Sequence, residues 1–396
     1  VVARRLTERV AFQPAIQEVL PAQDLAVNLL LHEQDAGPLL DHVGQPRALF
    51  DHGIAVQQIM ERDSQDLGPF DGMVGASSVS DTPPDQQELS PTSLERYATC
   101  PFQYFAEKRL RLEPVRAMRR DHLPALTLGT LIHAALRLSY ERMIAVQWPE
   151  AEIDRSTVRQ VIADSTAEVF AGHAATSGTG HALLWTMAQE QVVALVTLAA
   201  DSDREDYRET GYRPKAFEIE AEGLVSLGGE TADLKIHGTL DRLDVRLNPP
   251  GLRIVDYKFK QGSEMDTKDR NLVLGAARGA RLQPPLYVSM TIPAQPAPAE
   301  VQFVYLAPRW DPPIARSIFE RASLSGKTGE MITQTIRTLV QGIARQEFFI
   351  LPDAYCDQCV FSAACRRYDS TAWWRSYRSP EARALRRLRK LQVQDE

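Results

Sequence analysis

The fold is decided by the stretch Gly238-Thr-Leu-Asp241-Arg-Leu-Asp244, followed by Ile254-Val-Asp256-Tyr-Lys258. Apolar and polar residues alternate through both segments, as they do in β-strands. Between them, Asn248-Pro-Pro-Gly251 is a strong turn signal. We therefore expect two strands, at residues 234–247 and 252–260, that pair as an antiparallel hairpin.

The register of this hairpin decides which side chains share a face. If Leu247 pairs with Leu252, Asp241 lies opposite Lys258. Because side chains alternate across a strand, Asp241, Asp256 and Lys258 then lie on one face, about 5–8 Å apart. Two carboxylates at this spacing can hold a divalent metal ion, and the ammonium can act on an attacking water. The alternative is a surface hairpin with solvated Asp and Lys residues, and three further features count against it.

The first feature is a helix that contains a histidine. Apolar residues recur at helical spacing over residues 126–143, and Gly129 and His133 lie one turn apart on one face. Glycine permits close approach to another backbone, and His133 can offer an imidazole nitrogen to the same metal. A single helical His is also often an ordinary hydrogen-bonded residue, so this feature gains weight only in combination with the hairpin.

The second feature is Gln283-Pro-Pro-Leu-Tyr287, in which the prolines suit the first turn of a helix. The spacing sets an amide and a phenol one turn apart. A Tyr at this spacing is more often packed against a core than placed against a ligand. Both interpretations stay open from the residues alone.

The third feature is the pattern of the four cysteines: Cys100, and far downstream Cys356-x2-Cys359-x5-Cys365. Three clustered thiolates and a remote fourth suit a metal centre. Two disulfides are disfavoured, because the spacing of the trio would strain them and no signal peptide indicates an oxidising compartment. A [4Fe-4S] cluster is favoured over zinc, and zinc over unligated thiols.

The order of these motifs resembles the RecB-type branch of the PD-(D/E)xK nuclease superfamily. The residues that carry the resemblance are Gly129-x3-His133, Gly238-x2-Asp241-Arg-x-Asp244, Asp256-Tyr-Lys258 and Gln283-x3-Tyr287. The cysteine pattern is similar to that of the iron-sulfur members, in which the cluster joins the two ends of the nuclease domain. The chain is most similar to the C-terminal nuclease domain of AddB-type helicase-nuclease subunits. The resemblance covers roughly residues 88–367 and includes the entry segment at residues 89–105.

The resemblance implies a role for each motif residue. His133, Asp241 and Asp256 would be metal ligands and Lys258 would orient or activate the attacking water. Hard carboxylate ligands favour Mg²⁺ or Mn²⁺. Asp244, on the opposite face from Asp241, is more typical of a structural partner.

Two further sets of residues take implied roles outside the metal site. Gln283 and Tyr287 would position DNA beside it. The implied ligands of the [4Fe-4S] cluster are Cys100, Cys356, Cys359 and Cys365.

The implied fold is α/β: a restriction-endonuclease-like mixed β-sheet flanked by helices, with a helical insertion and a [4Fe-4S] staple. The implied activity is that of a Mg²⁺-dependent deoxyribonuclease, with single-strand exonuclease action, in a helicase-nuclease complex that processes double-strand breaks for recombinational repair. Its partners would be single-stranded DNA or unwound duplex ends, and a helicase subunit or domain. Two alternatives stay open: a stand-alone iron-sulfur nuclease of the CRISPR-adaptation type, and a cluster-stabilised DNA-binding scaffold that no longer cleaves.

The domain organisation follows from these anchors. We expect residues 1–76 to be a helical remnant of a preceding, helicase-like region, since the chain begins without Met, and residues 77–88 to be a linker. Residues 89–370 would form the nuclease domain, with a helical insertion at about 144–212. Further strands are expected at 213–225 and 300–307. Residues 371–396 would be a basic helical tail, whose aromatic and arginine side chains could contact DNA or pack on the domain.

Composition sets the remaining bounds. An apolar fraction of 44% is ample for a packed core. No run of 18 apolar residues occurs, so we expect no membrane span and a cytoplasmic location. The net charge of −7 favours DNA binding only at locally basic segments. Ser325-Gly326-Lys327-Thr328 is similar to the end of a Walker A loop, but Arg321 stands where the first glycine belongs, so we expect no ATP site.

Overall fold

The computed structural model describes residues 53–56, 58, 66–75, 89–113, 124–179, 181–228, 233–262, 267–292 and 295–392. Most of the predicted N-terminal remnant and all of the predicted linker lie outside these residues. The helicase-like region and the linker therefore stay predictions.

The described residues form one five-stranded sheet in the order β1-β2-β3-β4-β5. Neighbouring strands are antiparallel except β3 and β4, which are parallel and are connected through two helices, α10 and α11. The predicted mixed sheet is confirmed. The strands are β1 (Arg213–Val225), β2 (Leu234–Leu247), β3 (Pro250–Phe259), β4 (Glu300–Leu306) and β5 (Ile314–Glu320).

The β2–β3 hairpin turns more tightly than the sequence predicted. Leu247 pairs with Pro250 and Val245 with Leu252, so the predicted pairing of Leu247 with Leu252 is wrong by two residues. Proline is tolerated at the first residue of a strand, and β3 therefore begins inside the predicted turn. A shift by two residues preserves the alternation of side chains. The three reactive groups stay on one face.

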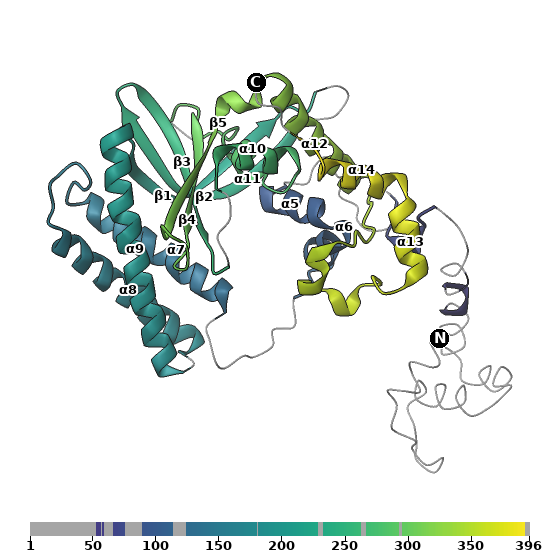
Figure 1. Ribbon diagram of the computed structural model, residues 1–396, viewed down its shortest axis with the longest axis horizontal. Coiled ribbons are helices and arrows are strands. Elements are labelled where there is room, and N and C mark those ends of the chain that lie inside the picture. Colours follow the sequence, from purple (N-terminus) through teal and green to yellow (C-terminus); the bar gives the residue numbers. More distant parts are fainter. Residues whose placement is uncertain are drawn as a thin grey trace, which may run out of the picture.

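Helices cover both faces of the sheet, and each face has its own apolar core (Figure 1). On one face, Val255 of β3 and Val304 of β4 pack against three long helices. On the other, Ile254 and Phe303 pack against the remaining helices. The first layer consists of α7 (Ala125–Ile144), α8 (Arg155–Ser177) and α9 (Ala182–Thr210), and the second of α5 (Pro91–Thr99), α10 (Asp269–Ala277), α11 (Gln283–Tyr287) and α12 (Gly326–Ala344).

Within the part of the chain that the structure describes, α9 is the one helix that is long and apolar enough to cross a membrane by length and composition. Its buried residues, among them Val192, Leu195 and Val196, belong to the core that α7 and α8 share with the sheet. This packing accounts for part of its apolar composition, since Leu183, Met187 and Leu198 are exposed.

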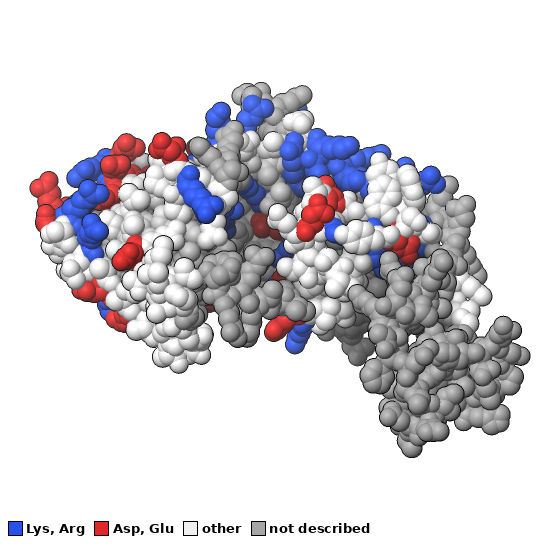
Figure 2. Space-filling view, turned by 60° about the horizontal axis from the view of Figure 1, so that its bottom comes forward, with Lys and Arg blue, Asp and Glu red and all other residues white. Residues whose placement is uncertain are grey.

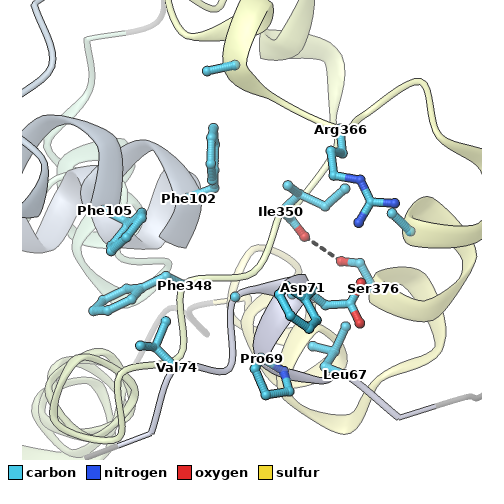
Figure 3. A pocket seen from close by; sticks show the side chains of 14 residues that line it. Leu67, Pro69, Asp71, Val74, Phe102, Phe105, Phe348, Ile350, Arg366 and Ser376 are labelled. Atoms are coloured by element: carbon cyan, nitrogen blue, oxygen red, sulfur yellow. Dashed lines mark hydrogen bonds between the residues drawn. The ribbon is translucent and has the colours of Figure 1, made fainter. Parts of the chain in front are cut away.

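The entry segment and the C-terminal segment lie side by side. The short helix α6 (Pro101–Tyr104) is joined to the returning chain by a hydrogen bond from the Phe102 amide to the Phe349 carbonyl, 3.1 Å long, and Tyr104 stacks on Phe348. An apolar cavity of about 240 Å³ lies between this junction, residues 67–74 and α13 (Ser370–Arg378), as Figure 3 shows. The two ends of the domain therefore meet.

The C-terminal tail is helical as predicted, with α13 followed by α14 (Pro380–Leu388). Lys and Arg side chains gather on the part of the molecule where α12 and α14 lie (Figure 2). The aromatic rings of α13 are engaged within the tail: the guanidinium of Arg378 lies 5.0 Å from the Trp374 ring centre, and that of Arg386 lies 4.5 Å from Tyr377. Trp374 and Tyr377 are nevertheless 48% and 49% exposed, so contact with DNA and packing on the domain both stay predictions for the tail.

Candidate active site

Asp241, Asp256 and Lys258 meet on one face of the sheet, as the sequence predicted. Oδ2 of Asp256 lies 2.6 Å from Nζ of Lys258. Continuing the hairpin register one step past the pair Arg242–Val255 places Asp241 opposite Asp256. The ladder ends at this point because Oδ2 of Asp241 itself accepts a hydrogen bond from the Tyr257 amide at 2.8 Å. The carboxylate thus takes the place of a backbone carbonyl.

Asp256 is the most perturbed carboxylate of this group. Its side chain is 6% exposed, and apart from the ion pair with Lys258 its Oδ2 has no hydrogen-bond partner among the described residues. Burial raises the pKa of Asp256 to about 6, although Lys258 acts in the opposite direction. The Lys258 ammonium compensates this buried charge. The carboxylates of Asp241 and Asp256 are hard oxygen donors, which suit a divalent ion of the Mg²⁺ or Mn²⁺ type.

His133 reaches this group from α7. Its Nε2 lies 3.1 Å from the Tyr257 carbonyl, toward which it can only donate, so Nδ1 is left facing Asp241 Oδ2 at 3.4 Å. Burial lowers the pKa of His133, but the contact with Asp241 outweighs it and the pKa is raised. Two adjacent ligands of an octahedral ion, each about 2.1 Å from the metal, stand about 3 Å apart. The separation of Nδ1 and Oδ2 fits such a pair.

The side chains of His133, Asp241 and Asp256 are not arranged as a complete set of metal ligands. Over the described ranges, no three His, Cys, Asp or Glu side chains are arranged so that they could hold a metal ion directly. His133 and Asp241 have the spacing of neighbouring ligands, whereas Asp256 is turned to Lys258. The assignment of all three as metal ligands stays a prediction.

Gln283 and Tyr287 lie beside the lysine. Nζ of Lys258 donates to Oε1 of Gln283 at 2.5 Å, and Nε2 of Gln283 donates to the Tyr287 hydroxyl at 3.1 Å. Tyr287 is only 5% exposed and packs in the core, so of the two interpretations that the sequence left open, core packing describes its side chain. A Cβ atom at Gly238 would come within 3.3 Å of the Tyr287 ring, which explains the glycine at that position. The role of the pair in DNA binding stays a prediction.

Glu95 of α5 was not singled out from the sequence. Its Oε1 accepts hydrogen bonds from the amides of Leu282 and Gln283, at 2.6 and 3.0 Å. Burial raises the pKa of Glu95. Only the position of Glu95 in the entry segment, five residues before Cys100, could have drawn attention to it.

The opposite face of the sheet holds a buried ionic network. Arg242 donates to Asp244 Oδ1 at 2.7 Å and to Asp203 of α9 at 2.6 Å, which confirms Asp244 as a structural partner of Arg242. Arg242 also donates to the Tyr257 hydroxyl at 2.5 Å. Although burial opposes it, Arg242 and Arg316 hold the pKa of Asp203 well below its usual range. Tyr257, which lies between Asp256 and Lys258, is therefore held by contacts on both faces of the sheet.

Replacement of Asp203 by alanine should lower the free energy of unfolding by about 3–5 kcal/mol, because it leaves the buried Arg242 charge partly uncompensated. The side chains of Arg242 and Asp203 are 1% and 2% exposed, so solvent cannot take over the interaction. Urea denaturation would measure the change. Asp201→Ala is the matched control on the same helix: its exposed pair with Arg155 should contribute less than about 1 kcal/mol. Equal losses in both variants would contradict the importance of the network.

The four cysteines line one small cavity, together with Tyr355. All four are free thiols, and Cys100 is buried. The Asp353 amide lies 3.4 Å from Cys356 Sγ. Burial raises the pKa of Cys365 to about 11, and the three other cysteines add to the effect. Sulfur donors are the ligands of iron-sulfur clusters and of structural zinc, but in the described residues the four thiols are not arranged as a metal-binding group, so a metal centre here stays a prediction.

Comparison with known proteins places the chain in a family. Residues 88–366 match the PD-(D/E)XK nuclease superfamily. The B subunit of the ATP-dependent helicase/deoxyribonuclease of Moorella thermoacetica is 26% identical over 315 residues, which cover 74% of this chain and 26% of that protein. The protein of the same name from Desulforamulus reducens is 27% identical over 252 residues, which cover 59% and 21%. That from Heliobacterium modesticaldum is 28% identical over 220 residues, which cover 52% and 17%.

These names confirm the resemblance to AddB-type subunits, and the chain spans about a quarter or less of the length of the relatives that it matches. The solved structure described as "Crystal structure of SSO0001" aligns with 71% of this chain and 97% of that one at 13% identity, with a TM-score of 0.25. Since the family match covers more than half of the sequence, the chain belongs to the PD-(D/E)XK nuclease superfamily.

Proposed function

We propose that this chain is a Mg²⁺- or Mn²⁺-dependent deoxyribonuclease that cuts single-stranded DNA, as part of a helicase-nuclease complex that processes double-strand breaks for recombinational repair. The observation that carries the proposal is Asp256, a buried carboxylate that is paired with Lys258 and lies opposite Asp241. Membership of the superfamily supports phosphodiester cleavage. The names of the relatives support a helicase partner, rather than a stand-alone nuclease or a non-catalytic scaffold.

In this proposal His133, Asp241 and Asp256 hold the ion, which when bound supplies Lewis-acid activation and stabilises negative charge at the phosphoryl group. Lys258 is held between Asp256 and Gln283. Burial lowers the pKa of Lys258, but Asp256 outweighs it and the pKa is raised. Nζ therefore keeps its proton at neutral pH. It can orient the attacking water and offer positive charge to the transition state, but it is not a general base in this state.

We also propose that Cys100, Cys356, Cys359 and Cys365 hold a [4Fe-4S] cluster, with zinc as the alternative. The shared cavity and the sulfur-rich donor set support this assignment. The cluster would join the entry segment to the C-terminal segment, which already meet at Phe102 and Phe349. Free thiols and such a cluster suit a reducing compartment, so we propose a cytoplasmic location.

The test is cleavage of an end-labelled single-stranded oligonucleotide by anaerobically purified protein. We expect fragments with Mg²⁺ or Mn²⁺ and none with EDTA, because hard oxygen ligands select these ions. The same oligonucleotide annealed to its complement should be cut only when a helicase partner and ATP are added. Cleavage that persists in EDTA would contradict the metal-dependent mechanism. Efficient cutting of blunt duplex without a helicase would contradict the proposed substrate.

A further inference from the structure

The helix α5 connects the cysteine cavity to the neighbourhood of the catalytic lysine. Its N-terminus is capped by Ser90, whose hydroxyl accepts from the Ser93 amide at 3.2 Å. Its C-terminal cap is Cys100, whose amide donates to the Arg96 carbonyl. Glu95 lies in the middle of this short helix, and its side chain is directed at α11 rather than at solvent.

Helix α11 cannot cap its own N-terminus. Its N-cap residue, Leu282, has no side chain that can accept a hydrogen bond, and Pro284 and Pro285 lack amide hydrogens. The amides of Leu282 and Gln283 are thus the only ones at this end that need an acceptor. Both donate to Oε1 of Glu95. Glu95 therefore supplies, from a distant part of the chain, the cap that the local sequence lacks.

The capped residue is the one that holds the lysine. Gln283 donates its backbone amide to Glu95 and accepts from Lys258 Nζ through its side chain. The nitrogen of its side-chain amide is held in turn by Tyr287. The orientation of the side-chain oxygen of Gln283, and hence the position of Nζ, depends on where Glu95 fixes the start of α11.

We infer that Glu95 is a positioning residue of the nuclease site, which places Lys258 through the backbone of Gln283 and makes α5 the link between Cys100 and the catalytic lysine. This inference rests on the proposed function. The hydrogen bonds of Glu95 go to the backbone of α11, so its effect on the reaction passes through Gln283.

The test compares Glu95→Ala, Glu95→Gln, Gln283→Ala and the double variant Glu95→Ala/Gln283→Ala. We expect Glu95→Ala and Gln283→Ala each to lower the single-turnover cleavage rate at saturating oligonucleotide by about 10–100-fold, and Glu95→Ala to leave the affinity for the oligonucleotide unchanged. Glu95→Gln keeps an acceptor oxygen and should retain activity within about threefold of the parent. The double variant should be no slower than the slower single variant, because both changes interrupt the same chain of contacts from Glu95 through Gln283 to Lys258.

A second readout does not depend on cleavage. The rate at which a small acylating reagent labels Lys258, followed by mass spectrometry, measures how firmly Gln283 and Asp256 hold its amine. Labelling of Lys258 should be several-fold faster in Glu95→Ala than in the parent or Glu95→Gln, while the exposed Lys327 is labelled equally in all of them. Glu107→Ala is the matched control, since it removes the carboxylate paired with Arg96 of the same helix without touching α11.

The outcomes separate the two proposals. If the parent cuts no DNA but Lys258 labelling changes as expected, the proposed function fails and the positioning role stands. Additive losses in the double variant, a Glu95→Gln variant as slow as Glu95→Ala, or unchanged labelling would each overturn the inference. Thermal unfolding of every variant sets an assay temperature at which all are folded.

Discussion

Replacement of Asp256 by asparagine should abolish metal-dependent cleavage of single-stranded DNA, with a fall in rate of about a thousandfold or more. Asparagine keeps the shape of the side chain but removes the charge that binds the ion and one half of the ion pair with Lys258. Single-turnover cleavage with Mg²⁺ and with Mn²⁺ would measure the loss. Iron content should be unchanged, because the cysteine cavity is lined by other residues.

The stability of the same variant provides the control. The pKa of Asp256 is raised to about 6 in the folded protein, above its unfolded value of about 3.9. The contribution of protonated Asp256 to the free energy of unfolding is therefore fully present below about pH 4, and it is lost as the pH rises through about 6. At pH 8 without metal, Asp256→Asn should unfold close to the parent, because removal of the buried Asp256 charge is offset by the loss of the partner of Lys258. Saturating Mg²⁺ should raise the unfolding temperature of the parent alone, since only the parent gains binding energy.

A variant that unfolds well below the parent in EDTA at pH 8 would show that its lost activity reflects misfolding. Residual activity near that of the parent would instead remove Asp256 from the catalytic site. The two results are distinguishable because the first is read from unfolding and the second from cleavage by folded protein.

Replacement of Cys359 by alanine should release iron and lower the melting temperature by about 10 °C or more. A centre that joins Cys100 to the trio at 356–365 closes a loop of most of the domain, and the removal of such a cross-link costs about 5 kcal/mol. For a domain of this size, each kcal/mol corresponds to about 2–4 °C. Iron analysis, visible absorption and calorimetry under anaerobic conditions would test the prediction.

Ser362→Ala is the matched control for this change. Ser362 lines the same cavity but carries no thiol, so its loss should leave iron and stability close to those of the parent. Unchanged iron and stability in Cys359→Ala would contradict the staple. Zinc in the parent, lost together with stability in the variant, would support the zinc alternative.

Much of the fold could be predicted because its signals are local. The alternation in β2 and β3 and the helical period around His133 depend on a few neighbouring residues each. The register was wrong by two because a turn signal does not say how many of its residues the strands will use. The strand β5 was not predicted, since Arg316 and Ser317 break its apolar pattern; Arg316 points to Asp203, at 2.7 Å, rather than to solvent.

The candidate site was predicted to the extent that it lies on one hairpin and one helix. Asp241 faces His133 and lies opposite Asp256, whereas the assignment of the three as metal ligands stays a prediction. The contact of Lys258 with Gln283, and the cap provided by Glu95, depend on how separate helices pack over the sheet. Glu95 and Leu282 are 187 residues apart in sequence. No local sequence pattern predicts a contact between residues so far apart in the chain.

Tyr257 gives the sheet a property that matters for redesign. Its amide and carbonyl contact Asp241 and His133, while its hydroxyl accepts from Arg242 on the reverse side. The contacts on the two faces of the sheet are therefore coupled through Tyr257. An engineer who repacks the α7–α9 layer for solubility or heat resistance would also change the distances between Asp241, His133 and Asp256, the proposed metal ligands. Tolerance to substitution should accordingly follow proximity to Tyr257 more closely than proximity to the substrate.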